Sequence, residues 1–124
     1  MEFNEKRLTA TEVISKIATY GDKDFVLSMD RDKNEDTINK YKLTSEDIIY
    51  YIRHLTVNNK PHCIENKDKR YKTKYLYEFK KNPIITIEDE YGDLVSVSMF
   101  FKVGFHSNKS IIYGVSFHED DFIK

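Results

Sequence analysis

The chain has 124 residues, 33% of them charged, and its formal net charge is −1 at pH 7. This length suits one domain with its own core, so we expect residues 1–124 to form a single domain. The balanced total charge neither favours nor excludes nucleic acid as a partner, and only the distribution of charge along the chain can do so.

Membrane insertion, secretion and a disulfide framework are not expected. No apolar run reaches the length of a membrane span, and residues 1–7 lack the apolar core of a signal peptide. The single cysteine, Cys63, cannot close an intramolecular disulfide, which agrees with a reducing compartment. We therefore expect a cytoplasmic protein without a membrane partner.

The first expected element is an amphipathic helix that follows a capping-box pattern at residues 9–12. Gly21 supplies its C-terminal stop, and its apolar residues recur at helical spacing: Val13, Ile14, Ile17 and Tyr20. The next apolar run, residues 25–27, fits either a strand or a segment tucked under the helix, and the pattern leaves both possibilities open.

Residues 30–40 are highly charged and predict a solvated loop or a short helix. They alternate like the start of a calcium loop, but Glu35 stands where the sharp turn needs glycine and Tyr41 where the bidentate glutamate belongs. Residues 43–48 combine an N-cap, acidic first-turn residues and a hydrophobic staple, which predicts a second helix. This helix should end at residues 58–61 and bury Ile48, Ile49, Ile52 and Leu55.

The composition changes between Lys60 and Lys81, where eight basic residues against three acidic ones give a net charge of +5. Aromatic residues are interleaved with the lysines, and rings that stack on bases beside cations that follow phosphates are typical of single-stranded nucleic-acid binding. The same alternation is equally typical of a half-exposed strand whose lysines protect a sheet edge. The segment alone does not decide between the two interpretations.

Two apolar runs, residues 84–88 and 94–105, flank a turn-rich link and predict a β-hairpin. The second strand is the longest in the chain and should lie centrally in the sheet. Side chains alternate along a strand, so residues 95, 97, 99, 101, 103 and 105 should form its core face. Phe100 and Lys102 then face the other way.

The last strand, residues 110–120, is expected to alternate in the same manner, with Ser116 and His118 beside Lys102 on the far side from the core. Its core face should hold Ile111, Tyr113, Val115 and Phe117. Helices followed by strands indicate an α+β fold in which the N-terminal helices pack on one face of a C-terminal antiparallel sheet. The opposite face should stay at least partly open.

Two short motifs carry a family resemblance. They are Met99-Phe100-Phe101-Lys102-Val103 in the long strand and Val115-Ser116-Phe117-His118-Glu119 in the last strand. With the order of the expected elements and the helix start at residues 43–48, they resemble the MqsR toxins of type II toxin-antitoxin systems, which have a RelE-like fold. The chain departs from that family in Phe100, where better-known members carry a tyrosine, and in the hairpin at residues 83–94, which has no evident counterpart.

The resemblance implies a metal-independent messenger-RNA endoribonuclease that a cognate antitoxin protein neutralises. RNA's own 2′-hydroxyl would attack the phosphorus and leave a 2′,3′-cyclic phosphate, while His118 moves protons and Lys102 stabilises the phosphorane. The resemblance also suggests Lys60 or His62 as a basic residue after the second helix and Tyr77 as a replacement for a missing polar group. The residues expected to bind RNA are Lys60, Arg70, Lys72, Lys74 and Tyr75.

Each of these residues also has a simpler interpretation. His118 can be a strand-end histidine that bonds to Glu119 or to backbone, and Lys102 can be a solvated sheet lysine. Four scattered histidines and one cysteine offer no zinc spacing, and no glycine-rich phosphate loop occurs, so no cofactor is expected. The alternative function is a small non-enzymatic phage or plasmid module that binds a protein through a sheet edge. Acidic residues at 88–90 and 119–121 would suit a basic partner.

Overall fold

The computed structural model describes residues 5–120, and within them it shows an α+β fold with three α-helices and a mixed six-stranded sheet. The helices are α1 (Ala10–Ile17), α2 (Asp32–Tyr41) and α3 (Ser45–Arg53). The strands are β1 (Phe25–Leu27), β2 (Pro61–Glu65), β3 (Tyr75–Phe79), β4 (Ile84–Glu88), β5 (Leu94–Phe105) and β6 (Ile112–Glu119). No helix in this part of the chain is long and apolar enough to cross a bilayer.

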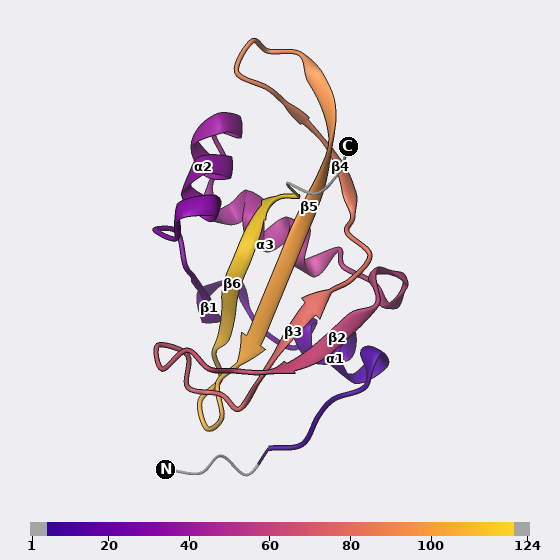
Figure 1. The fold of residues 1–124 in the computed structure, drawn as a ribbon, viewed down its shortest axis with the longest axis vertical. Helices are drawn as coiled ribbons and strands as arrows, with labels where there is room; N and C mark the ends of the chain where they lie inside the picture. Colours follow the sequence, from indigo (N-terminus) through magenta and orange to yellow (C-terminus); the bar gives the residue numbers. More distant parts are fainter. Residues whose placement is uncertain (1–4, 121–124) are drawn as a thin grey trace.

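Strand β5 is central, as the sequence predicts. The sheet order is β1-β6-β5-β3-β2, and β4 pairs with the first half of β5 to form a hairpin that projects beyond the other strands (Figure 1). The prediction of a purely antiparallel sheet is wrong at one edge, because β1 runs parallel to β6. The apolar run at residues 25–27, which the sequence left open, is therefore a strand.

Helices α1 and α3 begin where the sequence predicts. The side chains of Thr9 and Thr44 accept the backbone N–H of Glu12 and Asp47, and each of these carboxylates accepts the N–H of its threonine. Both helices lie behind the sheet in Figure 1, so the face turned toward the viewer carries neither of them. Four of their buried residues belong to the main core: Val13, Ile17, Ile48 and Ile52.

Helix α2 lies along the edge of β6 rather than on a face of the sheet. Strand β1 covers only the first half of that edge, and two side chains of α2 cover the second half. The amide of Asn34 donates to the backbone oxygen of Val115 and accepts the N–H of Phe117, while the hydroxyl of Thr37 accepts the N–H of Glu119. The backbone groups of this edge are thus satisfied without another strand.

Strand β6 contains a β-bulge. Lys102 and Val103 are consecutive in β5, but they pair with Ser116 and Gly114, which leaves Val115 as an extra residue. An extra residue reverses the alternation of side chains, so the two halves of β6 place opposite sets of residues on the core face.

The predicted core face of β6 is therefore wrong in its first half. Ile112 and Phe117 are both fully buried in the main core, although an odd number of positions separates them. Tyr113 and Val115 belong instead to a second apolar cluster on the face that α1 and α3 leave uncovered. The other members of this cluster are Tyr71 and Leu76, with Ile64 and Ile111 packed against it.

Candidate active site

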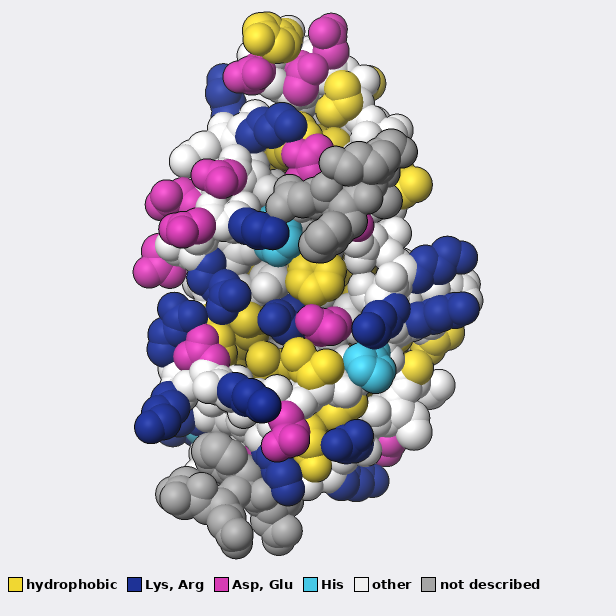
Figure 2. Space-filling model, viewed as in Figure 1, with side chains coloured by type: hydrophobic (Ala, Val, Ile, Leu, Met, Phe, Trp, Pro, Cys, Tyr) yellow, Lys and Arg dark blue, Asp and Glu magenta, His cyan; other side chains and the backbone are white. Residues whose placement is uncertain are grey.

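A row of polar side chains crosses the uncovered face of the sheet, which we call the open face. His62 of β2 pairs with Glu78 of β3, Glu78 pairs with Lys102 of β5, and Lys102 pairs with Ser116 of β6. Directly opposite residues of antiparallel strands have Cβ atoms about 4.5–5.5 Å apart, so these four side chains are neighbours. Figure 2 shows this face, with Lys and Arg side chains on both sides of a central band of hydrophobic ones.

His118 lies in the adjacent row, opposite Phe100. The centroids of the two rings are 5.3 Å apart, and Nδ1 of the imidazole lies 3.0 Å from the backbone oxygen of Glu119. Because a carbonyl oxygen can only accept, Nδ1 carries a proton. Nε2 has no hydrogen-bond partner within residues 5–120 and is available to a ligand.

Lys102 stands between a carboxylate on one side and an imidazole on the other. Glu78 is directly opposite it on β3, and His118 is diagonal to it on β6. Within the described part of the chain, neither Glu78 nor Lys102 forms a hydrogen bond or an ion pair. Both side chains are half-buried on the open face, and they contribute no polar contact that stabilises the described part of the fold.

Glu78 and His118 also line one cavity of about 340 Å³. Phe100 forms part of its wall. Five other residues complete the lining, two of them lysines and one of them acidic: Lys33, Phe79, Lys80, Asn82 and Asp120. A separate cavity of about 520 Å³ adjoins Lys102 on the other side of the row, over the apolar side chains of Ile64 and Leu76. A cavity that could hold a ligand therefore lies on each side of the row of polar residues.

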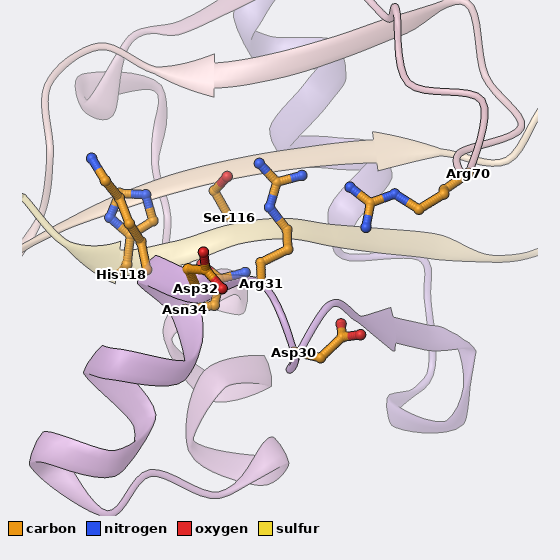
Figure 3. Close-up of a pocket in the computed structure, with 8 residues that line it drawn as sticks. Asp30, Arg31, Asp32, Asn34, Arg70, Ser116 and His118 are labelled. Carbon is orange, nitrogen blue, oxygen red and sulfur yellow. The ribbon is translucent and has the colours of Figure 1, made fainter.

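Figure 3 shows another cavity, of about 410 Å³, between β6 and the start of α2. Ser116 and His118 line it from the strand, and Arg31 and Arg70 approach it from the other side. The guanidinium of Arg70 binds the carboxylate of Asp68 at 2.7 Å, and that of Arg31 lies 3.9 Å from it. Hydrogen bonds from Arg70 lower the pKa of Asp68 to about 2, so this carboxylate stays ionised and offsets part of the positive charge.

Two residues expected at the site, Tyr77 and Tyr75, point to the helix-covered face instead. The hydroxyl of Tyr77 accepts the backbone N–H of Leu8 at 3.1 Å, and burial raises its pKa to about 12. Tyr75 is 9% exposed, and its ring lies beneath the cations of Arg7 and Lys74. The structure does not bring either ring to the open face, because β3 alternates and Glu78 takes that side.

The expected RNA-binding residues of the basic segment do not gather at one place. Arg70 lines the cavity beside His118, whereas Lys72 and Lys74 are exposed in the loop before β3. The backbone N–H of Lys72 donates to the hydroxyl of Tyr113, which places this loop at the far end of the sheet from His118. Lys60 is exposed in the turn before β2, where its backbone adopts a φ of 50°.

The sequence pattern did not single out Glu78 or Arg31. Alternation along β3 carries a signal for Glu78, since it has the opposite parity to the buried Tyr77. No local signal marks Arg31, because its position depends on how α2 packs against the edge of β6.

The acidic residues that would suit a basic partner lie apart from one another. Residues 88–90 are in the projecting hairpin, whereas the carboxylate of Glu119 binds Lys40 and Tyr41 at 3.0 Å each. Residue 121 lies outside the described residues. Within the described range, these acidic residues do not form one continuous strip.

Chemically, the open face offers a carboxylate, an ammonium and an imidazole in sequence across three strands, which is suited to proton transfer beside an anion. No group of three or more His, Cys, Asp or Glu side chains within residues 5–120 is placed to hold a metal ion. Comparison with known proteins gives no match: no family model fits the chain, and no curated protein or solved structure is significantly similar to it.

Proposed function

We propose that the protein is a metal-independent endoribonuclease that acts on single-stranded RNA at the open face. The observation that carries this proposal is the pairing of β5 with β6, which places Lys102 and His118 diagonally to each other on one face, with their functional atoms unpartnered within residues 5–120. Cleavage by the 2′-hydroxyl of RNA needs proton transfer and stabilisation of charge on phosphorus. Nε2 of His118 serves the first need and the ammonium of Lys102 the second.

The surroundings of these two residues suit an RNA strand. Phe100 offers a half-exposed ring for base stacking, and Arg31 and Arg70 offer cations for flanking phosphates. The two motifs that resemble MqsR toxins contribute Lys102 and His118, so motif and geometry single out the same pair. The proposal accordingly includes a RelE-like toxin of the cytoplasm that cleaves messenger RNA and is neutralised by an antitoxin.

Cleavage of a long single-stranded RNA of mixed sequence, in excess chelator, tests the proposal. The products should carry 2′,3′-cyclic phosphate and 5′-hydroxyl ends, identified by mass spectrometry. We expect His118→Ala to lower the cleavage rate by about 10²- to 10⁴-fold, because the proton donor is lost. His54→Ala is the matched control, since this exposed imidazole packs against the ring of Tyr50 of helix α3, away from the open face. Equal rates in the two variants would refute the proposal.

A protein-binding module is the second candidate, and the projecting hairpin favours it. Ile84, Tyr91 and Leu94 are 73%, 81% and 72% exposed there, next to the acidic residues 88–90. Exposed apolar side chains rimmed by charge are typical of protein contacts. Expression in bacteria separates the two candidates, because a ribonuclease arrests growth and degrades RNA, whereas a binding module does neither.

A further inference from the structure

We infer that Glu78 is the general base of the proposed cleavage and that His118 is its general acid. This inference rests on the proposed function and assigns the two proton transfers to two named side chains. Glu78 lies outside the two motifs that resemble MqsR toxins. Its assignment as the base follows from the geometry of the sheet alone.

Three neighbouring strands place a carboxylate, an ammonium and an imidazole in the order that in-line cleavage needs. In-line displacement places the attacking 2′-oxygen and the departing 5′-oxygen on opposite sides of phosphorus. The base and the acid must therefore flank the phosphate, with a cation near its non-bridging oxygens. Glu78 on β3, Lys102 on β5 and His118 on β6 have this order. Neighbouring strands are about 4.8 Å apart, so the outer two side chains can reach a phosphate held above the central one.

Glu78 also has no structural task among residues 5–120. It forms no hydrogen bond or ion pair there, although it is half-buried in the middle of the sheet. It shares the cavity of about 340 Å³ with Phe100 and His118. No hydrogen bond or ion pair of the described residues occupies this carboxylate, so it is free to act on a ligand in the cavity that it shares with His118.

The charged and titratable groups around Glu78 come from every neighbouring element. His62 faces it from β2 and Lys102 from β5, while four more groups line the shared cavity: Lys33, Lys80, His118 and Asp120. The lysines outnumber the other acidic residue, so the surroundings of this carboxylate carry a net positive charge. The same surroundings would suit a plain counter-ion, so the experiment must separate a base from a counter-ion.

The proposed step balances without water or metal. The 2′-hydroxyl gives its proton to the carboxylate of Glu78 while the 2′-oxygen bonds to phosphorus. The bond from phosphorus to the 5′-oxygen breaks, and that oxygen takes a proton from Nε2 of the His118 imidazolium. Nδ1–H stays bound to the backbone oxygen of Glu119, which orients the ring. Both side chains then return to their starting states by exchange with solvent.

The test is Glu78→Gln, which keeps the size of the side chain and removes its basicity. We expect kcat to fall by about 10²- to 10⁴-fold with little change in KM, and the loss of rate toward low pH to disappear from the pH profile. Glu78→Asp keeps a carboxylate and should recover part of the rate. Glu90→Gln, in the turn of the hairpin, is the control and should leave the rate and the profile unchanged.

An RNA with sulfur in place of the bridging 5′-oxygen separates the two roles, because a thiolate leaves without protonation. His118→Ala should cleave this substrate at nearly the wild-type rate, whereas Glu78→Gln should not. If Glu78→Gln keeps the wild-type rate and pH profile, or is the variant that the sulfur substrate restores, the inference is wrong while the proposed function stands. A wild-type protein that cleaves no RNA would overturn both.

Discussion

Asn34 is the residue that joins helix α2 to the strand carrying the candidate site. Its side chain is fully buried, donates to the backbone oxygens of Ser28 and Val115, and accepts the N–H of Phe117. Asn34→Ala would leave these buried groups unpaired, and we expect the free energy of unfolding to fall by about 3 kcal/mol. Urea unfolding measures it, with the exposed Asn39→Ala of the same helix as control. Equal losses in both variants would contradict this role.

Tyr77 is expected to matter for stability and not for cleavage. Tyr77→Phe removes the acceptor of the Leu8 N–H and should lower the free energy of unfolding by about 1 kcal/mol, while the RNA cleavage rate stays unchanged. A large loss of cleavage in a folded Tyr77→Phe protein would contradict the geometry.

The same variant should change the response of stability to alkali. Because burial raises the pKa of Tyr77 to about 12, the folded protein keeps the phenol neutral where the unfolded chain ionises it. This contribution is complete below about pH 10, the ordinary value for tyrosine, and is lost as the pH rises to about 12. Unfolding measured across this window should show a shallower decline for Tyr77→Phe than for the wild type.

At the residue scale, alternation along single strands predicts much of the candidate site. Lys102 and His118 lie on one face as their positions in β5 and β6 suggest. Tyr77 does not join them. Its expected role came from the family resemblance, which does not indicate the face on which the ring lies. Period-two alternation carries that information, and it also points to Glu78.

At the scale of elements, the loop before β3 controls how much positive charge reaches the open face. Asp68→Asn keeps the acceptor for the backbone N–H of Arg70 but removes the charge that Arg70 and Arg31 share. We expect tighter binding of single-stranded RNA. The logarithm of the binding constant should also fall more steeply with the logarithm of salt concentration, by about 0.7 in slope for each additional phosphate that the arginines neutralise.

Fluorescence anisotropy between about 50 and 200 mM salt measures this change, on a His118→Ala background that prevents cleavage. The control is Asp93→Asn, which removes one negative charge from the exposed end of the hairpin. An equal increase in affinity in both variants would mean that total charge, and not the freed arginines, determines binding.

Elements whose signals are local are predicted well, and those that depend on distant partners are not. Capping boxes identify the starts of α1 and α3. Helix α2 has no apolar stripe to reveal it, because Asn34 and Thr37 are its buried contacts with the strand. The bulge in β6 and the parallel pairing of β1 depend on how one strand pairs with another. The residues of a single strand do not reveal that pairing.

At the scale of the whole molecule, the net charge of −1 conceals a separation of charge. Figure 2 shows acidic side chains toward the hairpin end and Lys and Arg side chains around the middle and lower parts of the open face. Such a field attracts the phosphates of a nucleic acid to the face and repels them from the hairpin. The order of the expected helices and strands predicts the α+β class, but only the folded arrangement shows where each sign of charge collects.

The extra residue in β6 also prevents that strand from sliding along β5. A shift by one position would exchange the buried and solvent-facing sets of side chains, and Asn34 holds the backbone of the unmatched Val115 and of Phe117 in place. His118 and Lys102 therefore keep one fixed alignment in every copy of the protein. A reaction whose rate depends on precise placement of its catalytic side chains benefits from this fixed register.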